Sequence, residues 1–295
     1  MQQGDVRSTH TQGWINGFIG VLIFSGSLPA TRVAVSDFGP GFLTTARAAI
    51  AGLIALFVLI VAKEKKPDQR QVRSLLIVTS GVVVGFPLLS SLALQYLTAA
   101  HAMVFLGLLP LSTATFGVWL GGERPKPIFW FFSVLGSLLV IGYAVYQGLT
   151  ASPVGDLFML GAIILCGLGY AEGGKLSKEL GGWQVISWAL VLALPVMLPL
   201  CWLFFPPVVG FVKPASWIGL GYISLFSMFI GFIFWYKGLA QGGIASVGQL
   251  QLVQPFFGLA LAAVLLHEQV SMGMVAVTAG VIACVIASKR YGRRV

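Results

Sequence analysis

The sequence predicts an all-α integral membrane protein in which ten transmembrane helices form two inverted repeats of five helices. Three observations lead to this prediction: ten apolar runs of membrane-spanning length, basic residues that alternate between their ends, and motifs that recur in the second half. The composition agrees, because 57% of the 295 residues are hydrophobic and only 9% are charged. That leaves too little polar surface for a water-soluble globule and excludes a disordered chain.

The ten apolar runs are each close to the roughly 20 residues with which a helix crosses a bilayer. Backbone groups in lipid must be paired within their own segment, so runs of this length are expected to be helices. None of them shows the alternation of a β-barrel strand. The predicted spans are residues 14–35, 40–62, 74–95, 98–119, 128–148, 153–174, 183–205, 214–237, 244–266 and 271–288.

The basic residues predict the orientation of these spans. If the spans alternate, every Lys and Arg except Arg32, Arg47 and Lys213 falls on the side of the N-terminus, most densely in the loop 63–73. Basic loops of membrane proteins face the cytoplasm. Both termini are therefore predicted to be cytoplasmic, in the inner membrane of a cell. The net charge of +9 is explained by this topology, and no nucleic-acid partner is expected.

The second half of the chain repeats features of the first. Matches at an offset of 145 are Ala100 with Ala245, Pro110 with Pro255, and Glu123 with Glu268. Matches at an offset of 141 are Gly26 with Gly167, Ala30 with Ala171, and Gly41 with Gly182. The predicted repeats are residues 12–149 and 153–290. Because five is odd, the two repeats must cross the membrane in opposite directions, a plan that recurs in secondary transporters with a site near the midplane.

The segment from Pro110 to Glu123 ends in Leu-Gly-Gly-Glu, and the segment from Pro255 to Glu268 ends in Leu-Leu-His-Glu. With the span pattern and the duplication, these motifs resemble the EamA family of the drug/metabolite transporter superfamily over nearly the whole chain. The resemblance implies ten helices, two EamA repeats, cytoplasmic termini and, in many members, export of amino acids and related metabolites. The layout is most similar to the aromatic amino acid exporters of bacterial inner membranes. Gly167 and Leu109 stand where those exporters are expected to carry aromatic side chains, which predicts a broader or differently shaped cavity.

Polar residues inside spans are costly and mark candidate sites. In span 9, Ser246, Gln249, Val253 and Gln254 share one helical face, while Gln251 points elsewhere. This face either lines a cavity, where an amide can bind a zwitterion, or joins helices by hydrogen bonds. The other candidates for the cavity are Ser90 and Ser91 in span 3, His101 with Phe105 and Leu108 in span 4, Tyr170 in span 6, and Tyr222 with Phe226 and Phe229 in span 8.

Several of these residues have a second interpretation. His101 is either a titrating group of the outer vestibule or an interfacial side chain with a hydrogen bond. The aromatic stripe of span 8 is either cavity wall or packing, and Trp235 with Tyr236 fits the interfacial aromatic belt. Glu172, three residues before Lys175, is either an interfacial ion partner or a proton-coupling carboxylate.

Arg47 lies within span 2. It either extends outward to the interface or binds a substrate carboxylate or a helix terminus. Pro110 and Pro255 each remove a backbone donor and are interpreted as gating positions rather than passive kinks. Glu123 and Glu268 are expected to cap the N-terminus of a neighbouring helix or to pair with a basic loop residue.

The predicted function is a secondary transporter that exports small neutral or zwitterionic metabolites, most of all amino acids including aromatic ones, by alternating access through a central cavity. A proton-coupled multidrug or organic-cation exporter is the main alternative, but no acidic residue lies deep in a span. A channel would need a ring of carbonyls or charges. No nucleotide loop, metal cluster or nucleophile–base set is found, so neither a cofactor, nor a metal, nor an enzymatic activity is expected. The expected partners are a small-molecule substrate and the lipid bilayer, and the sequence is compatible with a monomer.

Overall fold

The first repeat contains five helical units in the computed structural model, which describes residues 2–146, 152–206 and 212–292. Three of these units change helix type or break along their length. In chain order the elements are α1 Gln2–Ser25 with α2 Ser27–Val35, α3 Pro40–Val61, α4 Gln69–Val78 with η1 Thr79–Gly85 and α5 Phe86–Tyr96, α6 Ala99–Phe105 with η2 Leu106–Leu108 and α7 Leu109–Gly121, and α8 Pro127–Tyr146.

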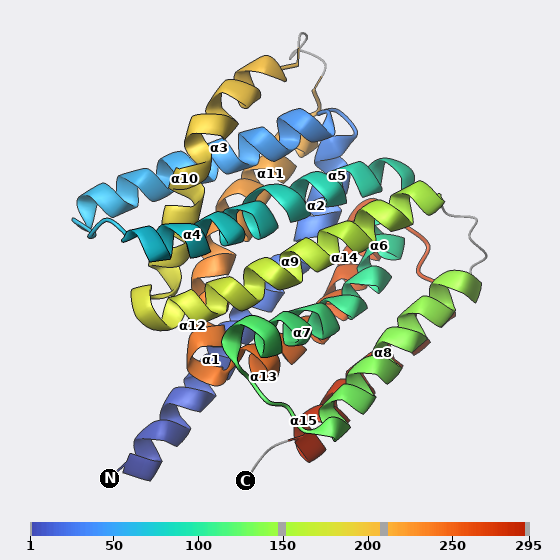
Figure 1. Cartoon of the computed structure of the whole chain (residues 1–295). Helices are drawn as coiled ribbons and strands as arrows, with labels where there is room; N and C mark the ends of the chain where they lie inside the picture. Colours follow the sequence, from blue (N-terminus) through green and yellow to red (C-terminus); the bar gives the residue numbers. More distant parts are fainter. Residues whose placement is uncertain (1, 147–151, 207–211, 293–295) are drawn as a thin grey trace.

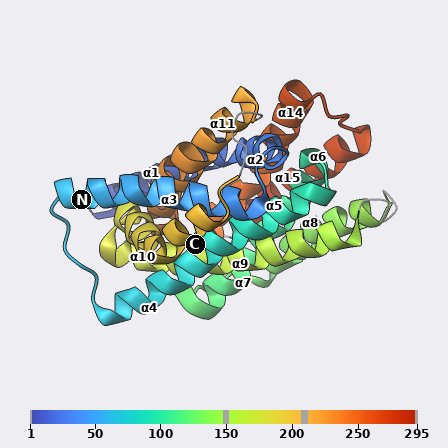
Figure 2. The same cartoon turned by 90° about the horizontal axis from the view of Figure 1, so that it is seen from above.

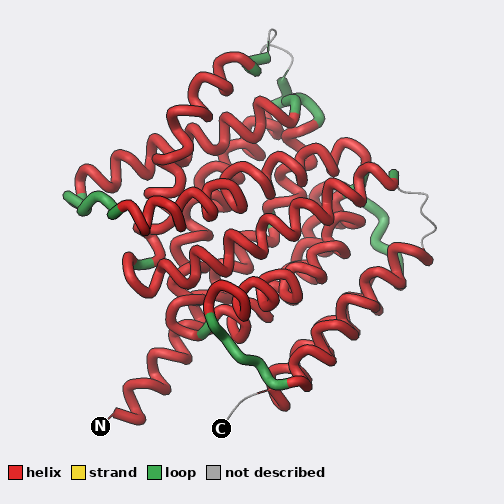
Figure 3. The backbone as a smooth tube through the Cα atoms, in the orientation of Figure 1, coloured by secondary structure: helices red, strands yellow, loops and turns green. Residues whose placement is uncertain are grey.

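The second repeat follows the same plan. Its elements are α9 Pro153–Leu180, α10 Gly182–Leu203, α11 Pro214–Gly221 with η4 Tyr222–Ile230 and α12 Gly231–Gly242, α13 Ile244–Gly248 with η5 Gln249–Val253 and α14 Gln254–Leu266, and α15 Met272–Gly292. Figure 3 shows helix along almost the whole described chain, with loops confined to the ends of the bundle.

Eight of the helical units are long and apolar enough to cross a membrane, and the apolar helices 127–139 and 272–284 complete the set within the described residues. The prediction of an all-helical membrane fold is therefore confirmed. Both termini lie at the same end of the bundle as the turns that follow Val61, Gly121, Leu180 and Gly242 (Figure 1). The two repeats thus run in opposite directions, as five helices each require. The predicted boundary of the first repeat, at 149, lies outside the described residues.

Contacts between the repeats build the bundle. Helix α1 packs along α12, α3 along α10, and both α5 and α7 along α9. Viewed from above, α1, α2, α11 and α14 lie on one side of the bundle, and α4, α7 and α9 lie on the other (Figure 2). Helices α8 and α15 pair with each other at the edge (Figure 1). The central site is consequently built from elements of both repeats.

The third and fourth helical units carry the same irregularities in both repeats. The third units contain π-helical segments, η1 and η4, and the fourth units contain 3₁₀ segments, η2 and η5. Each 3₁₀ segment directly precedes the helix that begins with Pro110 or Pro255 at its N-terminus. Because proline lacks an N–H and crowds the preceding turn, it explains the altered helix type there.

Short local signals mark the helix ends. Asp68 forms a capping box with Gln71 at the start of α4. The loop residue Asp37 accepts a hydrogen bond from the Ser216 hydroxyl at 2.7 Å and another from the backbone N–H of Lys213 at 3.0 Å. The Ser216 bond and then the Lys213 bond lower the pKa of Asp37. This carboxylate ties the loop before α3 to the start of α11.

Candidate functional site

The first helical unit is broken near its middle, at Gly26 between α1 and α2. Pro29 supplies the reason, since it has no N–H to donate to the carbonyl of Ser25 and its ring crowds that carbonyl. Two carbonyls before the break accept side-chain hydrogen bonds from the second repeat. The Tyr222 hydroxyl donates to Ile23 at 2.7 Å, and the Gln254 amide donates to Phe24 at 3.3 Å. Broken helices at membrane depth occur where the backbone lines a cavity or is buried in protein.

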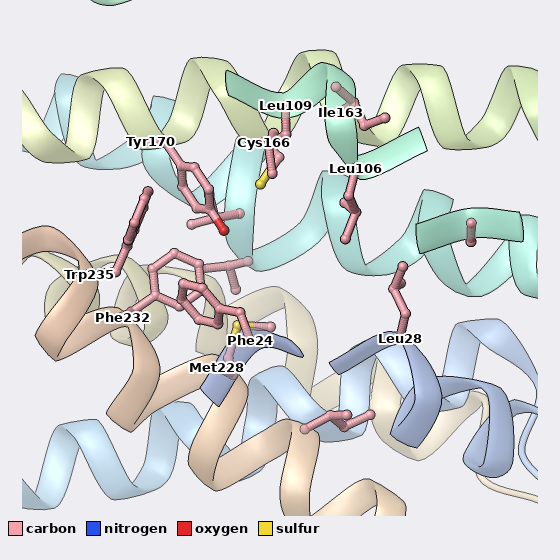
Figure 4. Packing of buried hydrophobic residues seen from close by; sticks show 14 of the residues in the cluster. Phe24, Leu28, Leu106, Leu109, Ile163, Cys166, Tyr170, Met228, Phe232 and Trp235 are labelled. Atoms are coloured by element: carbon pink, nitrogen blue, oxygen red, sulfur yellow. The ribbon is translucent and has the colours of Figure 1, made fainter. Parts of the chain in front are cut away.

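An aromatic cluster surrounds this break. The Phe24 ring lies 6.3 Å from that of Tyr170, 5.0 Å from Phe232 and 6.2 Å from Trp235, measured between centroids. Tyr170 also lies 5.2 Å from Trp235. Figure 4 shows Tyr170, Trp235, Phe232 and Phe24 gathered together, with the Tyr170 hydroxyl directed away from Trp235. The four rings form an apolar wall contributed by α1, α9 and α12.

Arg47 brings a positive charge into the same region. The residue is only 2% exposed, and its Nη2 lies 3.4 Å from the carbonyl oxygen of Ile223 and 3.5 Å from the Ser227 hydroxyl. Ser227 in turn donates to Ser27, directly after the break, at 2.9 Å. Arg47 therefore points into the protein rather than outward to the interface.

Several buried polar atoms have no hydrogen-bond partner among the described residues. They include Nε and Nη1 of Arg47, Oε1 of Gln254, Oγ of Ser91 and Nε1 of Trp235. Leaving such a group unpaired costs about 1–3 kcal/mol, and more when it is charged. Natural proteins accept this cost where a ligand supplies the partner. The break at Gly26, the aromatic wall, Arg47 and Gln254 make up the candidate site.

The predicted polar face of span 9 does not stay together. Gln254 bonds to Phe24 at the break, whereas Gln249 lines a small pocket between α7, α8 and α15 that Pro110 and Cys284 also line. The reason is η5, because a 3₁₀ helix has about 3.0 residues per turn instead of 3.6 and rotates the preceding side chains away. Gln251 is bonded to the Thr113 hydroxyl at 3.4 Å.

The predicted aromatic stripe of span 8 also divides. Phe226 is 44% exposed on the outside of the bundle, Tyr222 is half-buried beside the break, and Phe229 is buried. The stripe assumed α-helical spacing, but residues 222–230 form the π-helix η4, which has more residues per turn. Phe226 is therefore partly exposed, although its ring still stacks on that of Tyr222 at a centroid distance of 5.6 Å.

Trp235 and Tyr236 correct a second prediction, because neither lies in the interfacial aromatic belt. Both side chains are fully buried. Trp235 packs against Phe24 and Tyr170, and the Tyr236 hydroxyl donates to the carbonyl of Gly169 at 3.1 Å. Gly173 leaves the space that the Tyr236 ring occupies. Sequence hydropathy could not separate these residues from a belt, because a lipid-facing and a protein-facing aromatic residue look alike in it.

His101 is placed at the opposite end of the bundle from the termini, at the start of α6. Its Nε2 lies 3.0 Å from a carboxylate oxygen of Asp156 in the first turn of α9, and its ring lies 5.4 Å from that of Phe105. Phe105 and Leu108 are buried. Sequence reasoning missed Asp156, since nothing in the spacing of 55 residues indicates the pairing. His101 thus belongs to a pair at the rim, apart from the aromatic cluster.

Glu123 and Glu268 cap helices reciprocally across the repeats. Glu123 accepts from the backbone N–H groups of Ile244 and Ala245, both at 2.7 Å. Glu268 accepts from those of Ala99 and Ala100, at 3.1 and 2.8 Å. Glu123 thus follows the fourth unit of the first repeat and caps the fourth unit of the second, and Glu268 does the reverse. The prediction that these residues cap a neighbouring helix is confirmed.

The remaining candidates lie near span ends or within packed helices. The Glu172 carboxylate is buried and lies 3.8 Å from the Lys175 ammonium, which forms the predicted ion pair. The Ser90 hydroxyl donates to the carbonyl of Pro87 at 3.3 Å. Pro110 and Pro255 follow the 3₁₀ segments at matching places of the two repeats. The two prolines thus occupy symmetry-related positions in the two repeats.

Comparisons with known proteins agree with this architecture. The sequence profile of the EamA-like transporter family matches residues 11–145 and again residues 153–288. An uncharacterized transporter of Bacillus subtilis (strain 168), YdeK, is 63% identical over 96% of this chain and 99% of its own length. An uncharacterized transporter of Archaeoglobus fulgidus is 22% identical over 84% of this chain and 87% of its own.

A solved crystal structure superposes with a TM-score of 0.74 and covers 97% of this chain and 99% of the other, at 19% identity. At that identity the likeness concerns the fold alone. The family profile and the relative of Bacillus subtilis concern the kind of protein, which is a membrane transporter and not an enzyme. The chain belongs to the EamA-like transporter family.

Proposed function

We propose that the protein is a secondary transporter for small neutral or zwitterionic metabolites, in the first place amino acids with large apolar or aromatic side chains. The observation that carries this proposal is the buried guanidinium of Arg47, which is linked through Ser227 to Ser27 at the break, where the aromatic wall begins with Phe24. A guanidinium suits a carboxylate, and four rings suit a large apolar side chain. The amide oxygen of Gln254, which lies at the break, adds a neutral acceptor for an ammonium.

Alternating access is supported by the symmetry of the two repeats. Inverted repeats allow each half to adopt the conformation of the other around a fixed central site. The reciprocal caps of Glu123 and Glu268 lie at opposite ends of the paired fourth units. Pro110 and Pro255 sit where each of these units changes helix type, and we assign them to the gating motion. The outward direction of transport rests on the family resemblance.

The arrangement of acidic groups disfavours the cation-exporter alternative. A transporter of organic cations is expected to place an unpaired carboxylate at the site. Among the described residues, Glu172 is the buried acid, and it pairs with Lys175, while the partly buried Asp156 pairs with His101. Neither contacts the aromatic cluster. A neutral or zwitterionic solute fits these observations better.

Transport by the purified protein in proteoliposomes tests the function. A panel of radiolabelled amino acids should show counterflow for phenylalanine, tryptophan and leucine above that for aspartate and lysine. Liposomes with an Arg47→Gln variant serve as the matched control. Transport of organic cations or inorganic ions alone would refute the proposal.

The membrane and the orientation belong to the same proposal. We place the protein in the bacterial inner membrane with both termini in the cytoplasm, because the loop 63–73 and the other basic segments lie at the end of the bundle that holds the termini (Figure 1). Single cysteines introduced at Asp68 and Asp37 should react with an impermeant maleimide from opposite sides, in a background without Cys166, Cys201 and Cys284. Equal labelling would contradict the orientation. We expect the monomer to be sufficient for transport.

A further inference from the structure

The charge of Arg47 has no counter-charge in the described part of the protein. The ion pairs there join Arg70 to Glu179, His101 to Asp156, and Lys175 to Glu172. The hydrogen-bond partners of Arg47 are both neutral, the Ile223 carbonyl and the Ser227 hydroxyl. Its Nε and Nη1 have no acceptor at all. The central site is therefore cationic as it stands.

A buried, unpaired charge is among the most costly features that a protein can retain, and inside a membrane the cost is higher still. The protein lowers this cost only slightly, because the contacts of Nη2 are long, at 3.4 and 3.5 Å. An anion that enters the site and accepts hydrogen bonds from the guanidinium would remove the imbalance. The architecture thus favours a ligand with a carboxylate.

The site offers no negative charge to balance an ammonium. Its unpaired acceptor is the Gln254 amide oxygen, which is neutral. A zwitterion would leave the loaded site with the positive charge that it had when empty. A monocarboxylate without an amine would make the loaded site neutral, which is the cheaper state in a low-dielectric environment.

We infer that the central site recognises the carboxylate and the large apolar group of its ligand and does not require the ammonium. Deaminated monocarboxylates, such as arylalkanoic acids and 2-oxo acids with aromatic or branched side chains, are then ligands of the same site. This inference rests on the proposed function, and it specifies that the carboxylate, rather than the ammonium, is the charged group that the site recognises. Amines that lack a carboxylate should not bind.

Three probes with one aromatic group test this inference: L-phenylalanine, 3-phenylpropionate and 2-phenylethylamine. They carry a carboxylate with an ammonium, the carboxylate alone, and the ammonium alone. Each is added in excess to proteoliposomes that exchange radiolabelled phenylalanine, so leakage of the unlabelled acid does not disturb the readout. We expect 3-phenylpropionate to inhibit within about threefold of phenylalanine, and 2-phenylethylamine to be at least about tenfold weaker, a gap of about 1.4 kcal/mol.

Inhibition by the amine and not by the acid would overturn the inference and leave amino acid transport standing. Thermal unfolding of the detergent-solubilised protein tests the case in which amino acid transport is absent but the carboxylate still binds. If phenylalanine is not transported but 3-phenylpropionate still raises the melting temperature in a concentration-dependent way, the proposed function fails and the carboxylate site remains. A protein that responds to none of the probes contradicts both.

Substitutions test whether Arg47 is the residue that binds the carboxylate. Arg47→Gln should raise the half-inhibitory concentration of 3-phenylpropionate by at least about tenfold without lowering the melting temperature, because it removes a buried charge. Arg32→Gln is the matched control, since Arg32 donates to the carbonyl of Leu94, away from the aromatic cluster. If Arg47→Gln does not fold, Gln254→Leu keeps the test open: it should weaken phenylalanine more than 3-phenylpropionate. Equal inhibition by the acid in Arg47→Gln and in the parent protein would refute the role of Arg47.

Discussion

The first helical unit of one repeat is broken, and its counterpart in the other repeat is continuous. Helices α1 and α2 are separated at Gly26, while α9 runs without interruption through Gly167, the residue that matches Gly26. The same offset of 141 places Tyr170 opposite Pro29. One repeat therefore carries a residue that cannot complete the helix, and the other carries an aromatic residue that can.

These two departures from symmetry meet at the centre of the bundle. The Phe24 ring before the break stacks on the Tyr170 ring at 6.3 Å, with an interplanar angle of 16°. The features that both repeats keep are the π and 3₁₀ segments and the reciprocal glutamate caps. One of them, η4, also reaches the break, because Tyr222 bonds to Ile23 and Ser227 bonds to Ser27. The repeats therefore share their helix irregularities and caps but differ in their first units.

Removal of the Tyr170 ring, which packs against the broken unit at Phe24, should have the largest effect, a loss of stability. Tyr170→Ala deletes the contacts with Phe24, Phe232 and Trp235 and should lower the free energy of unfolding by about 3–5 kcal/mol. Tyr170→Phe should keep most of the stability. Phe226→Ala is the control, because that residue is 44% exposed and has no contact with the four rings among the aromatic pairs of the described residues. Denaturant titration in detergent measures the difference, and equal losses for Ala at 170 and 226 would show that the cluster is not the stabilising core.

Restoration of the helix at the break should have the next largest effect. Pro29→Ala supplies an N–H that can bond to the carbonyl of Ser25, so the unit should straighten as α9 does. We expect transport to fall about tenfold, or about 1.4 kcal/mol in the barrier, while the melting temperature rises or stays constant. Pro199→Ala within α10 is the matched control. If Pro29→Ala transports at the parental rate, the break is not needed for function.

Substitution of the two buried glutamines of span 9, Gln249 and Gln254, should affect transport to different degrees. Gln254→Leu leaves the Phe24 carbonyl without its side-chain donor and should reduce transport of many amino acids together, by about 1–2 kcal/mol in the apparent affinity. Gln249→Leu should have a small effect, because Gln249 faces the pocket between α7, α8 and α15. Counterflow at several substrate concentrations distinguishes them. A stronger effect at 249 would move the site toward α8 and α15.

Substitution of the prolines in the fourth helical units, Pro110 and Pro255, should have the smallest effect on transport. Pro110→Ala and Pro255→Ala should each slow turnover a few-fold, with a smaller change in expression and apparent affinity. Because the two positions are equivalent in the repeats, the two variants should behave alike. Single-turnover and steady-state counterflow report the rate. Unchanged turnover in both variants would show that these prolines are passive kinks.

Local sequence signals predicted much of the fold and part of the symmetric frame. The spans follow from run length, since lipid forces each apolar segment to pair its own backbone. Glu123 and Glu268 were predictable as caps, because an acidic residue at a span end suits a helix N-terminus nearby. The pair of Glu172 with Lys175 followed from a spacing of three residues on one helix. Each of these features depends on neighbours in the chain or on the solvent.

The composition of the central site was decided by the tertiary structure. Sequence spacing placed Gln249 with Gln254 on one helical face, but the 3₁₀ segment η5 changes the rotation per residue and separates them. Hydropathy could not tell that Trp235 and Tyr236 are buried or that Asp156 meets His101. The sequence alone determined that ten helices form two opposed repeats, because lipid and helix geometry leave few alternatives. Only the packing of those helices decided that Ser227 links Arg47 to the break at Gly26 and that four aromatic rings meet at Phe24, because their partners lie far apart in the chain.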